Sequence, residues 1–139
     1  ATVLAHRVFY VPMRFTLDTP GEMNAVRSYS AGAVTLGSSG GSERTVHGPC
    51  IIARDTVISD WPATSLAGLQ PEHLDAVFAL GPQIVIAGTH APDRLAPPAI
   101  RRLCRERGIA LEGMELGAAC RTYNVLLQEE RLVVALLFP

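Results

Sequence analysis

Apolar residues in this chain gather into continuous blocks at two places in its second half. One block covers 132–137, with Phe138 behind it, and the other covers 84–87. Continuous apolar runs of this length are typical of strands that are covered on both faces. We therefore predict that both blocks form central, buried strands of a sheet.

Between and around these blocks, the apolar positions follow a helical period. Three stripes at i, i+3 and i+4 predict three helices, which start near Pro71, near Pro98 and at Gly117. Gly81 and Gly108 are predicted to end the first two helices, and 109–111 reads as a short strand. The stripe residues are Leu74, Val77 and Phe78; Ile100, Leu103 and Cys104; and Tyr123, Leu126 and Leu127.

The first half of the chain has a different rhythm. Short apolar runs separated by Gly, Ser and Asp over 26–61 predict an antiparallel meander. Its loop at 38–42 is rich in Gly and Ser, but it lacks the Lys-Ser/Thr ending of a phosphate-binding loop, so we interpret it as a plain hairpin. Pro12 makes residues 1–25 an edge strand or an extended arm.

These elements predict one α/β domain over 1–139, a length that suits a single core. We expect three layers, with a mixed, partly parallel central sheet flanked by helices. Residues 1–25 form the arm or edge strand, 26–61 the N-terminal antiparallel β-meander layer, and 62–139 the α/β part. The meander either packs against the central sheet or continues into it.

Composition narrows the classes of partner. Twelve basic residues, all Arg, stand against thirteen acidic ones, so the formal charge of -1 provides no field for nucleic acid. We expect no membrane span, because no window reaches roughly 18 to 20 apolar residues. Three scattered cysteines without a CxxC pair predict no metal site and unpaired, reduced thiols, which suits a cytoplasmic protein. We expect no cofactor, since the chain has no GxGxxG turn.

The second half also carries a resemblance, through the ordered segments DTVISDW, PQIVIAGT, GIALEGME and AACRTYNVLL. From about Tyr29 onward the chain resembles a widespread family of small uncharacterised proteins. That family includes the mitochondrial assembly factor 3 of respiratory complex I and an adipogenesis-associated relative. The resemblance implies a three-layer α/β fold around a mixed sheet and a role in assembly. Two departures from the family pattern are His90 and Glu130, which stand where glycines are expected.

Candidate chemistry lies where the first buried strand ends. Ligands of open α/β sheets settle at the carboxyl ends of strands, and the predicted helix after 116 brings polar groups toward that edge. A guanidinium fork beside a helix N-terminus favours a carboxylate or phosphate. The candidate ligand-binding residues are Gly88, Thr89, His90, Arg121, Thr122, Asn124 and Glu112. We assign no catalytic residue and no metal ligand.

Other interpretations of the same residues stay open. Arg121 has a structural alternative, in which it pairs with Glu112 or Glu115. Cys120 sits near a helix start and has His90 as its one credible base, but we favour a buried structural thiol. Four arginines in 101–107 are interpreted as a solvated face, with docking of an acidic partner as the alternative.

Three functions are therefore compatible with the sequence. The first is a non-catalytic binding or assembly-type module with a protein partner and a small anionic ligand. The second is an enzyme acting on a small carboxylate or phosphate in a cleft formed by Gly88, Thr89, Arg121 and Asn124. The third is a stable oligomer subunit without chemistry, built through exposed apolar strands, for which a homodimer is one form. The resemblance favours the first.

Overall fold

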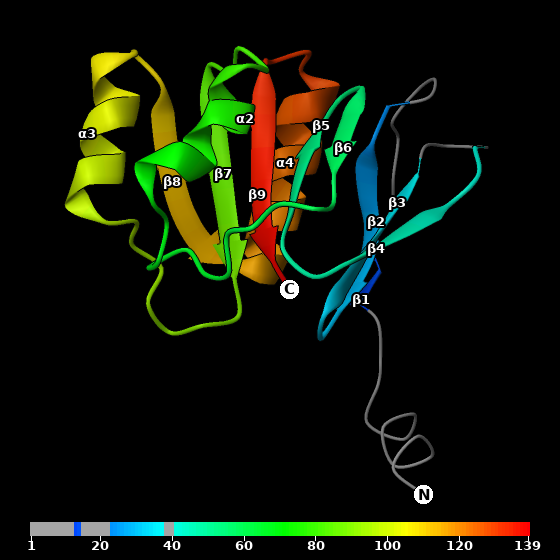
Figure 1. The fold of residues 1–139 in the computed structure, drawn as a ribbon. Helices are drawn as coiled ribbons and strands as arrows, with labels where there is room; N and C mark the ends of the chain where they lie inside the picture. The colour runs from blue at the N-terminus through cyan, green and yellow to red at the C-terminus, as the bar shows by residue number, and fades with distance from the viewer. Residues whose placement is uncertain (1–12, 15–22, 38–40) are drawn as a thin grey trace, which may run out of the picture.

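The computed structural model describes residues 13–14, 23–37 and 41–139, which form two sheets and the helices around them (Figure 1). The first sheet is antiparallel with the order β1-β2-β3-β4, and the second is mixed with the order β6-β5-β9-β7-β8. The strands are β1 (Met13–Arg14), β2 (Ala25–Ser30), β3 (Ala33–Gly37), β4 (Arg44–His47), β5 (Cys50–Ala53), β6 (Thr56–Ile58), β7 (Ile84–Thr89), β8 (Ala110–Glu115) and β9 (Val133–Phe138). The helices are the 3-10 turn η1 (Pro71–Leu74), α2 (Asp75–Phe78), α3 (Pro98–Glu106) and α4 (Leu116–Gln128).

The two predicted central strands are confirmed as β7 and β9. β9 is the middle strand of the second sheet and pairs parallel with β7 and antiparallel with β5, while β7 lies between β9 and β8. The prediction for Leu132 is wrong, because its side chain is 57% exposed and the strand begins at Val133. Leu132 instead supplies the carbonyl that receives the amides of Gln83 and Ile84 as the chain enters the sheet.

Alternating side chains of β9 enter two different cores. Val133, Ala135 and Leu137 pack with α4 and the first sheet. Val134, Leu136 and Phe138 pack on the opposite face with η1, α2 and α3. Figure 1 shows the same division, with α2 and α3 in front of the second sheet and α4 behind it. Both faces are covered, which is why the strand needs an unbroken apolar sequence.

The predicted meander divides between the two sheets. β2, β3 and β4 follow one another as antiparallel neighbours, but the β5–β6 hairpin joins the second sheet through an antiparallel pairing of β5 with β9. Cys50 and Ile52 belong to the core on the α4 side, and Ile51 belongs to the other core. A strand that is apolar on both faces requires a position inside a covered sheet, so 50–58 continues into the central sheet.

Several element boundaries differ from the predictions. The first predicted helix is a 3-10 turn followed by the single turn of α2, and β8 extends to Glu115 instead of ending at 111. α3 has the predicted span, with Gly108 beyond it in the left-handed conformation (φ +69°). None of the helices in the described ranges is long and apolar enough to cross a membrane.

The N-terminal arm and the Gly/Ser loop can be followed only in part. Met13–Arg14 pairs with Ser28 and Tyr29 as a two-residue strand at the edge of the first sheet. The remainder of 1–22 and residues 38–40 lie outside the described part of the chain.

Candidate functional site

α4 positions the candidate site because it starts where the parallel strands end and contacts both sheets. Thr89 at the end of β7 is the register partner of Glu115 at the end of β8, and α4 begins at the next residue, Leu116. One side of α4 packs on β7 and β9, and another reaches β2 of the first sheet. The carboxyl edge of the parallel strands therefore meets the first sheet at the N-terminus of this helix.

Gly88 and Thr89 serve the local backbone at this edge. A Cβ at Gly88 would lie 2.5 Å from the Cβ of Ala119, so glycine is what allows α4 to approach β7 so closely. The side chain of Thr89 is 3% exposed, and its hydroxyl accepts a hydrogen bond of 3.0 Å from the amide of Ala91. Both residues shape the turn that leads to His90.

Asn124 faces the first sheet and is bound to its backbone. Its Oδ1 accepts a hydrogen bond from the amide of Val26, and its Nδ2 donates one to the carbonyl of the same residue, each at 2.9 Å. The side chain is 6% exposed. Its carboxamide thus pairs with β2 as another strand would, next to the register shift between Val26 and Ser28. The side-chain amide of Asn124 therefore joins α4 to β2 of the first sheet.

A second hydrogen bond strengthens the same link. The buried hydroxyl of Tyr123 donates to the carbonyl of Asn24 at 2.6 Å. Burial raises the pKa of Tyr123, which keeps it a proton donor at neutral pH. Two consecutive residues of α4 therefore hold the entry to β2.

Glu115 caps α4 and occupies the positive end of its dipole. Its carboxylate accepts hydrogen bonds from the amides of Gly117 (2.8 Å) and Ala118 (3.3 Å). The bond from Gly117 is the main reason that the pKa of Glu115 lies below its usual range, and His90 and Arg121 lower it further. The sequence analysis considered Glu115 as a partner of Arg121, and the structure shows it as the N-terminal cap of α4. The signal for its capping role is its place directly before the first helical residue.

Tyr29 brings the first sheet to the same corner. Any Cβ at Gly117 would overlap the hydroxyl of Tyr29, and the ring of Tyr29 lies 6.2 Å from the ring of His90 between centroids. Burial raises the pKa of Tyr29, with a further contribution from the charge of Glu115. Tyr29 was missed by sequence reasoning, since it lies 61 to 92 residues before the other residues of this corner in the chain.

Arg121 and His90 remain exposed at this corner. In the described part of the chain, no carboxylate lies within ion-pair distance of Arg121, so neither Glu112 nor Glu115 forms the bridge considered above. Glu112 is exposed on β8, and the hydroxyl of Thr122 points to the sulfur of Met114 at 3.6 Å. We call Tyr29, His90, Glu115 and Arg121 the edge corner.

Cys120 is a buried thiol, as the sequence interpretation favoured. Its side chain is fully buried, and burial raises its pKa to about 12. Cys50 is buried in the same core, and all three cysteines are free. A thiol with such a pKa is almost entirely protonated at neutral pH, so it is a poor nucleophile.

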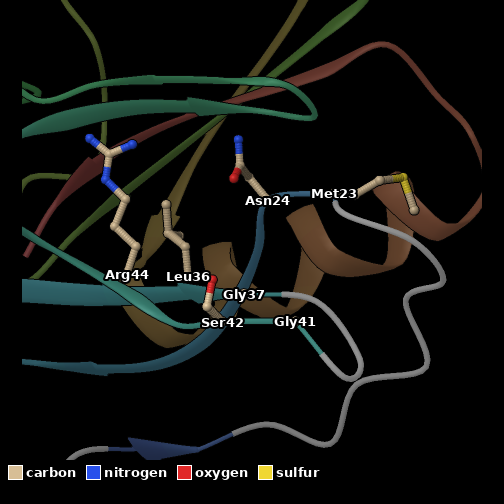
Figure 2. Close-up of a pocket in the computed structure, with 7 residues that line it drawn as sticks. All are labelled: Met23, Asn24, Leu36, Gly37, Gly41, Ser42 and Arg44. Atoms are coloured by element: carbon tan, nitrogen blue, oxygen red, sulfur yellow. The ribbon is translucent and has the colours of Figure 1, made fainter.

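A hollow of about 240 Å³ lies at the other end of the first sheet, next to the Gly/Ser loop. Figure 2 shows Asn24, Leu36 and Arg44 extending on the same side of the strands. The side-chain amide of Asn24 donates a hydrogen bond to the carbonyl of Ala53. Among the described residues that line the hollow, Arg44 is the charged one. No group of three or more His, Cys, Asp or Glu in the described ranges is arranged to hold a metal ion.

Comparisons with known proteins agree with this fold. The mouse NADH dehydrogenase [ubiquinone] 1 alpha subcomplex assembly factor 3 is 31% identical over 116 residues, which are 82% of this chain and 60% of the mouse protein. The zebrafish protein of the same name is 36% identical over 98 residues, 68% of this chain and 55% of its own length. This chain therefore spans little more than half of either relative.

A solved structure and a family pattern show the fold and the family of this chain. An NMR structure of a Xanthomonas campestris protein superimposes with a TM-score of 0.72 at 32% identity, covering 91% of this chain and 92% of the other. The pattern of a family described as proteins of unknown function (DUF498/DUF598) matches residues 26–138, which include the whole second sheet, the first sheet apart from β1 and the first residue of β2, and the edge corner. The chain is thus similar to assembly factor 3 in sequence and belongs to the DUF498/DUF598 family.

Proposed function

We propose that this chain is a non-catalytic, protein-binding module of the assembly-factor type. The observation that carries the proposal is the similarity to NADH dehydrogenase assembly factor 3, which extends over 82% of the chain in the mouse comparison. The family pattern over 26–138 holds the second sheet, most of the first sheet and α4, which are the surfaces proposed here for a partner. A role in the assembly of NADH dehydrogenase, the enzyme in the name of these relatives, is part of this proposal.

The chemistry of the edge corner and of the candidate residues around it supports binding over catalysis. Thr89, Glu115 and Asn124 already have backbone partners, and the thiol of Cys120 is buried. Removing a buried polar group from such a partner costs about 1–3 kcal/mol, so these side chains are poorly placed to change partners during a reaction. The exposed side chains of His90 and Arg121 remain for recognition.

We further propose that the edge corner accepts a carboxylate. The binding free energies available there favour a carboxylate that belongs to a partner protein. Glu115 already occupies the helix amides, so Arg121 and His90 would have to hold an anion through exposed side chains. A charge-assisted hydrogen bond contributes about 1.5–3 kcal/mol, whereas millimolar affinity requires about 4 kcal/mol. A small free anion would therefore bind weakly, while a partner's carboxylate would add to a larger interface.

Deleting the gene in the source organism tests the assembly role. The amount of fully assembled NADH dehydrogenase, measured on native gels, should fall while its subassemblies accumulate, and the wild-type chain should restore it. Photo-crosslinking at position 121 should join the chain to a subunit of that enzyme. Unchanged assembly together with an absence of crosslinks to its subunits would refute the proposal.

Titration calorimetry separates the two kinds of ligand. Small carboxylates and inorganic phosphate should bind no more tightly than roughly millimolar. Arg121→Gln should weaken whatever binding is measured, while Arg131→Gln, a change of the same type at another exposed site, should not. Micromolar binding of a small anion, lost in Arg121→Gln, would favour a small-ligand site over a docking corner.

A further inference from the structure

We propose that α3 and the loop before it form a docking surface for an acidic segment of a partner protein that carries an apolar side chain. The surface consists of Arg94, Leu95, Arg101, Arg102 and Arg105, and we call it the basic ridge. The inference rests on the protein-binding role proposed above and assigns a surface and a partner chemistry to it. α3 lies at the β8 end of the second sheet, far from the first sheet (Figure 1).

Charge is distributed unevenly along this chain. Residues 93–107 contain five arginines and two acidic residues, while the rest of the chain contains seven arginines and eleven acidic residues. The ridge is therefore a local positive region on a protein whose formal charge is -1. Such a region attracts a short acidic segment and leaves the remaining surface repulsive to a long polyanion.

Arg101 of the ridge and Arg107, just beyond it, are fixed by contacts within the chain. The Nε of Arg101 donates to the carbonyl of Ala96 at 3.1 Å, and the guanidinium of Arg107 lies 4.1 Å from the ring centre of Phe78. These contacts stiffen the two ends of the helix. Arg101 keeps further N–H donors free for a carboxylate, since a guanidinium has five.

The other arginines of the ridge are open to solvent. Arg94, Arg102 and Arg105 are exposed, and in the described part of the chain none of them is in ion-pair contact with a carboxylate. The nearby carboxylate of Asp93 accepts a hydrogen bond from the amide of Leu95 at 3.2 Å. Arg101 and Arg105 stand four residues apart and so share one side of α3. Guanidinium groups are thus presented along the helix.

An apolar anchor point lies beside these charges. Leu95 is 59% exposed, although large apolar side chains are usually covered. It borders a hollow of about 30 Å³ whose lining includes Leu66, Leu111, Arg94 and Arg101. A hollow of this size has room for roughly two water molecules, so it suits the end of one side chain and not a separate small molecule.

The ridge is also rigid. A Cβ at Gly113 would overlap the carbonyl of Arg94, so the loop is seated directly on the backbone of β8. Pro97 and Pro98 restrict the start of the helix. A surface that is ordered before binding loses less conformational entropy on binding.

The ridge fits an acidic protein segment better than a nucleic acid. Binding of single strands usually relies on aromatic side chains that stack on the bases, and the ridge has none. Carboxylates match the planar fork of arginine, and Leu95 offers contact to an apolar residue between them. A leucine flanked by glutamates would use both features.

Fluorescence anisotropy and amide NMR test the proposal with a labelled peptide of about 12 residues that repeats Glu-Glu-Leu-Glu. We expect the peptide to shift the amide signals of 94–105 and to bind less tightly as salt is raised, because about 1 M salt shortens the screening length to about 3 Å. Arg102→Glu with Arg105→Glu should weaken binding by roughly tenfold, since each exposed pair is lost and replaced by repulsion. Leu95→Ser should weaken it by roughly threefold.

A second double variant is the matched control. Arg44→Glu with Arg131→Glu makes the same change in net charge at exposed sites away from α3, and it should change the affinity by less than about twofold. Thermal melting of both double variants checks that they remain folded. Equal weakening in the two double variants would show a general charge effect and overturn the proposal. Tighter binding of duplex DNA or of phosphatidylserine vesicles to the ridge would overturn it as well.

The outcome can be separated from that of the proposed function. If Arg102→Glu with Arg105→Glu binds the peptide normally and restores NADH dehydrogenase assembly fully in the deletion strain, the ridge is refuted and the assembly role stands. If the peptide binds the ridge but deletion leaves assembly unchanged, the assembly role is refuted and the ridge stands.

Discussion

Replacing Asn124 with alanine removes both groups that pair with the backbone of Val26. Val26 is fully buried, so its amide and carbonyl would lose their partners where water has little access. An unsatisfied buried group costs about 1–3 kcal/mol, and for the two groups we expect the free energy of unfolding to fall by about 2–4 kcal/mol. Domains have about 5–15 kcal/mol in total. At about 4 °C per kcal/mol, the melting temperature should fall by about 8–16 °C.

Urea unfolding followed by the fluorescence of Trp61, the single tryptophan, measures this loss. The slope of the free energy against urea should stay unchanged if only the native contacts differ. Arg121→Gln is the control one turn earlier on α4, and because Arg121 is exposed it should change the stability by no more than about 0.5 kcal/mol. An Asn124→Ala loss below about 0.5 kcal/mol, or an equal loss in Arg121→Gln, would refute the reasoning.

Asn124→Asp adds a test of the sign of the effect. The new carboxylate still accepts from the amide of Val26 but meets the carbonyl of Val26 without a proton to donate. Its pKa in the folded state should therefore be raised above the unfolded value of about 3.9. The stabilising contribution of the protonated form is fully present below that value and is lost as the pH rises through the folded pKa. Relative to wild type, the variant should thus recover stability as the pH falls, which urea unfolding at several pH values would reveal.

Four further predictions concern the helix ends and the packing of α4. Gly88→Ala should lower the free energy of unfolding by about 1–3 kcal/mol in urea, because the new Cβ meets Ala119, and adding Ala119→Gly should restore part of it. Glu115→Gln should destabilise the protein at neutral pH by up to about 1 kcal/mol. Because folding lowers the pKa of Glu115, the difference from wild type should begin to shrink as the pH falls below the unfolded value of about 4.3 and should vanish only below the lower pKa of the folded state; a pH-independent difference would contradict this. Glu130→Gly should raise the melting temperature by roughly 2 °C in scanning calorimetry, because relief of the left-handed backbone (φ +60°) exceeds the added flexibility of the unfolded chain. A lower melting temperature in the variant would contradict this. Cys120 should resist iodoacetamide at pH values near 8 until urea unfolds the chain, and fast labelling of the native protein at this position would show that the thiol is accessible.

The central strands could be predicted from the sequence because their signal is local. Strands β7 and β9 are covered on both faces, so their unbroken apolar sequences were enough to identify them. The placement of β5 could not be predicted in the same way. Its apolar run is compatible with a meander or with the central sheet, and only its pairing with β9, more than eighty residues later, decides between them.

The candidate site could be predicted less completely. Sequence reasoning located the edge and chose His90 and Arg121, which the structure leaves exposed there. It also chose Asn124, whose spacing from Arg121 suggested a shared polar face. The amide instead pairs with backbone 98 residues away, and backbone groups leave no trace in a sequence. Tyr29 was missed for a similar reason, because its place depends on how the first sheet sits on α4.

The central position of β9 has a consequence for the order of folding. β9 separates the β6–β5 pair from the β7–β8 pair in the second sheet, yet it follows all of these strands in the chain. During synthesis the earlier strands emerge with the middle of their sheet missing, and the hydrogen bonds of α4 to Asn24 and Val26 also span about a hundred residues. Loop closure over such separations slows folding. The nascent chain must therefore keep two open strand edges apart until β9 arrives, and a chain that ends before Val133 would expose both edges to aggregation.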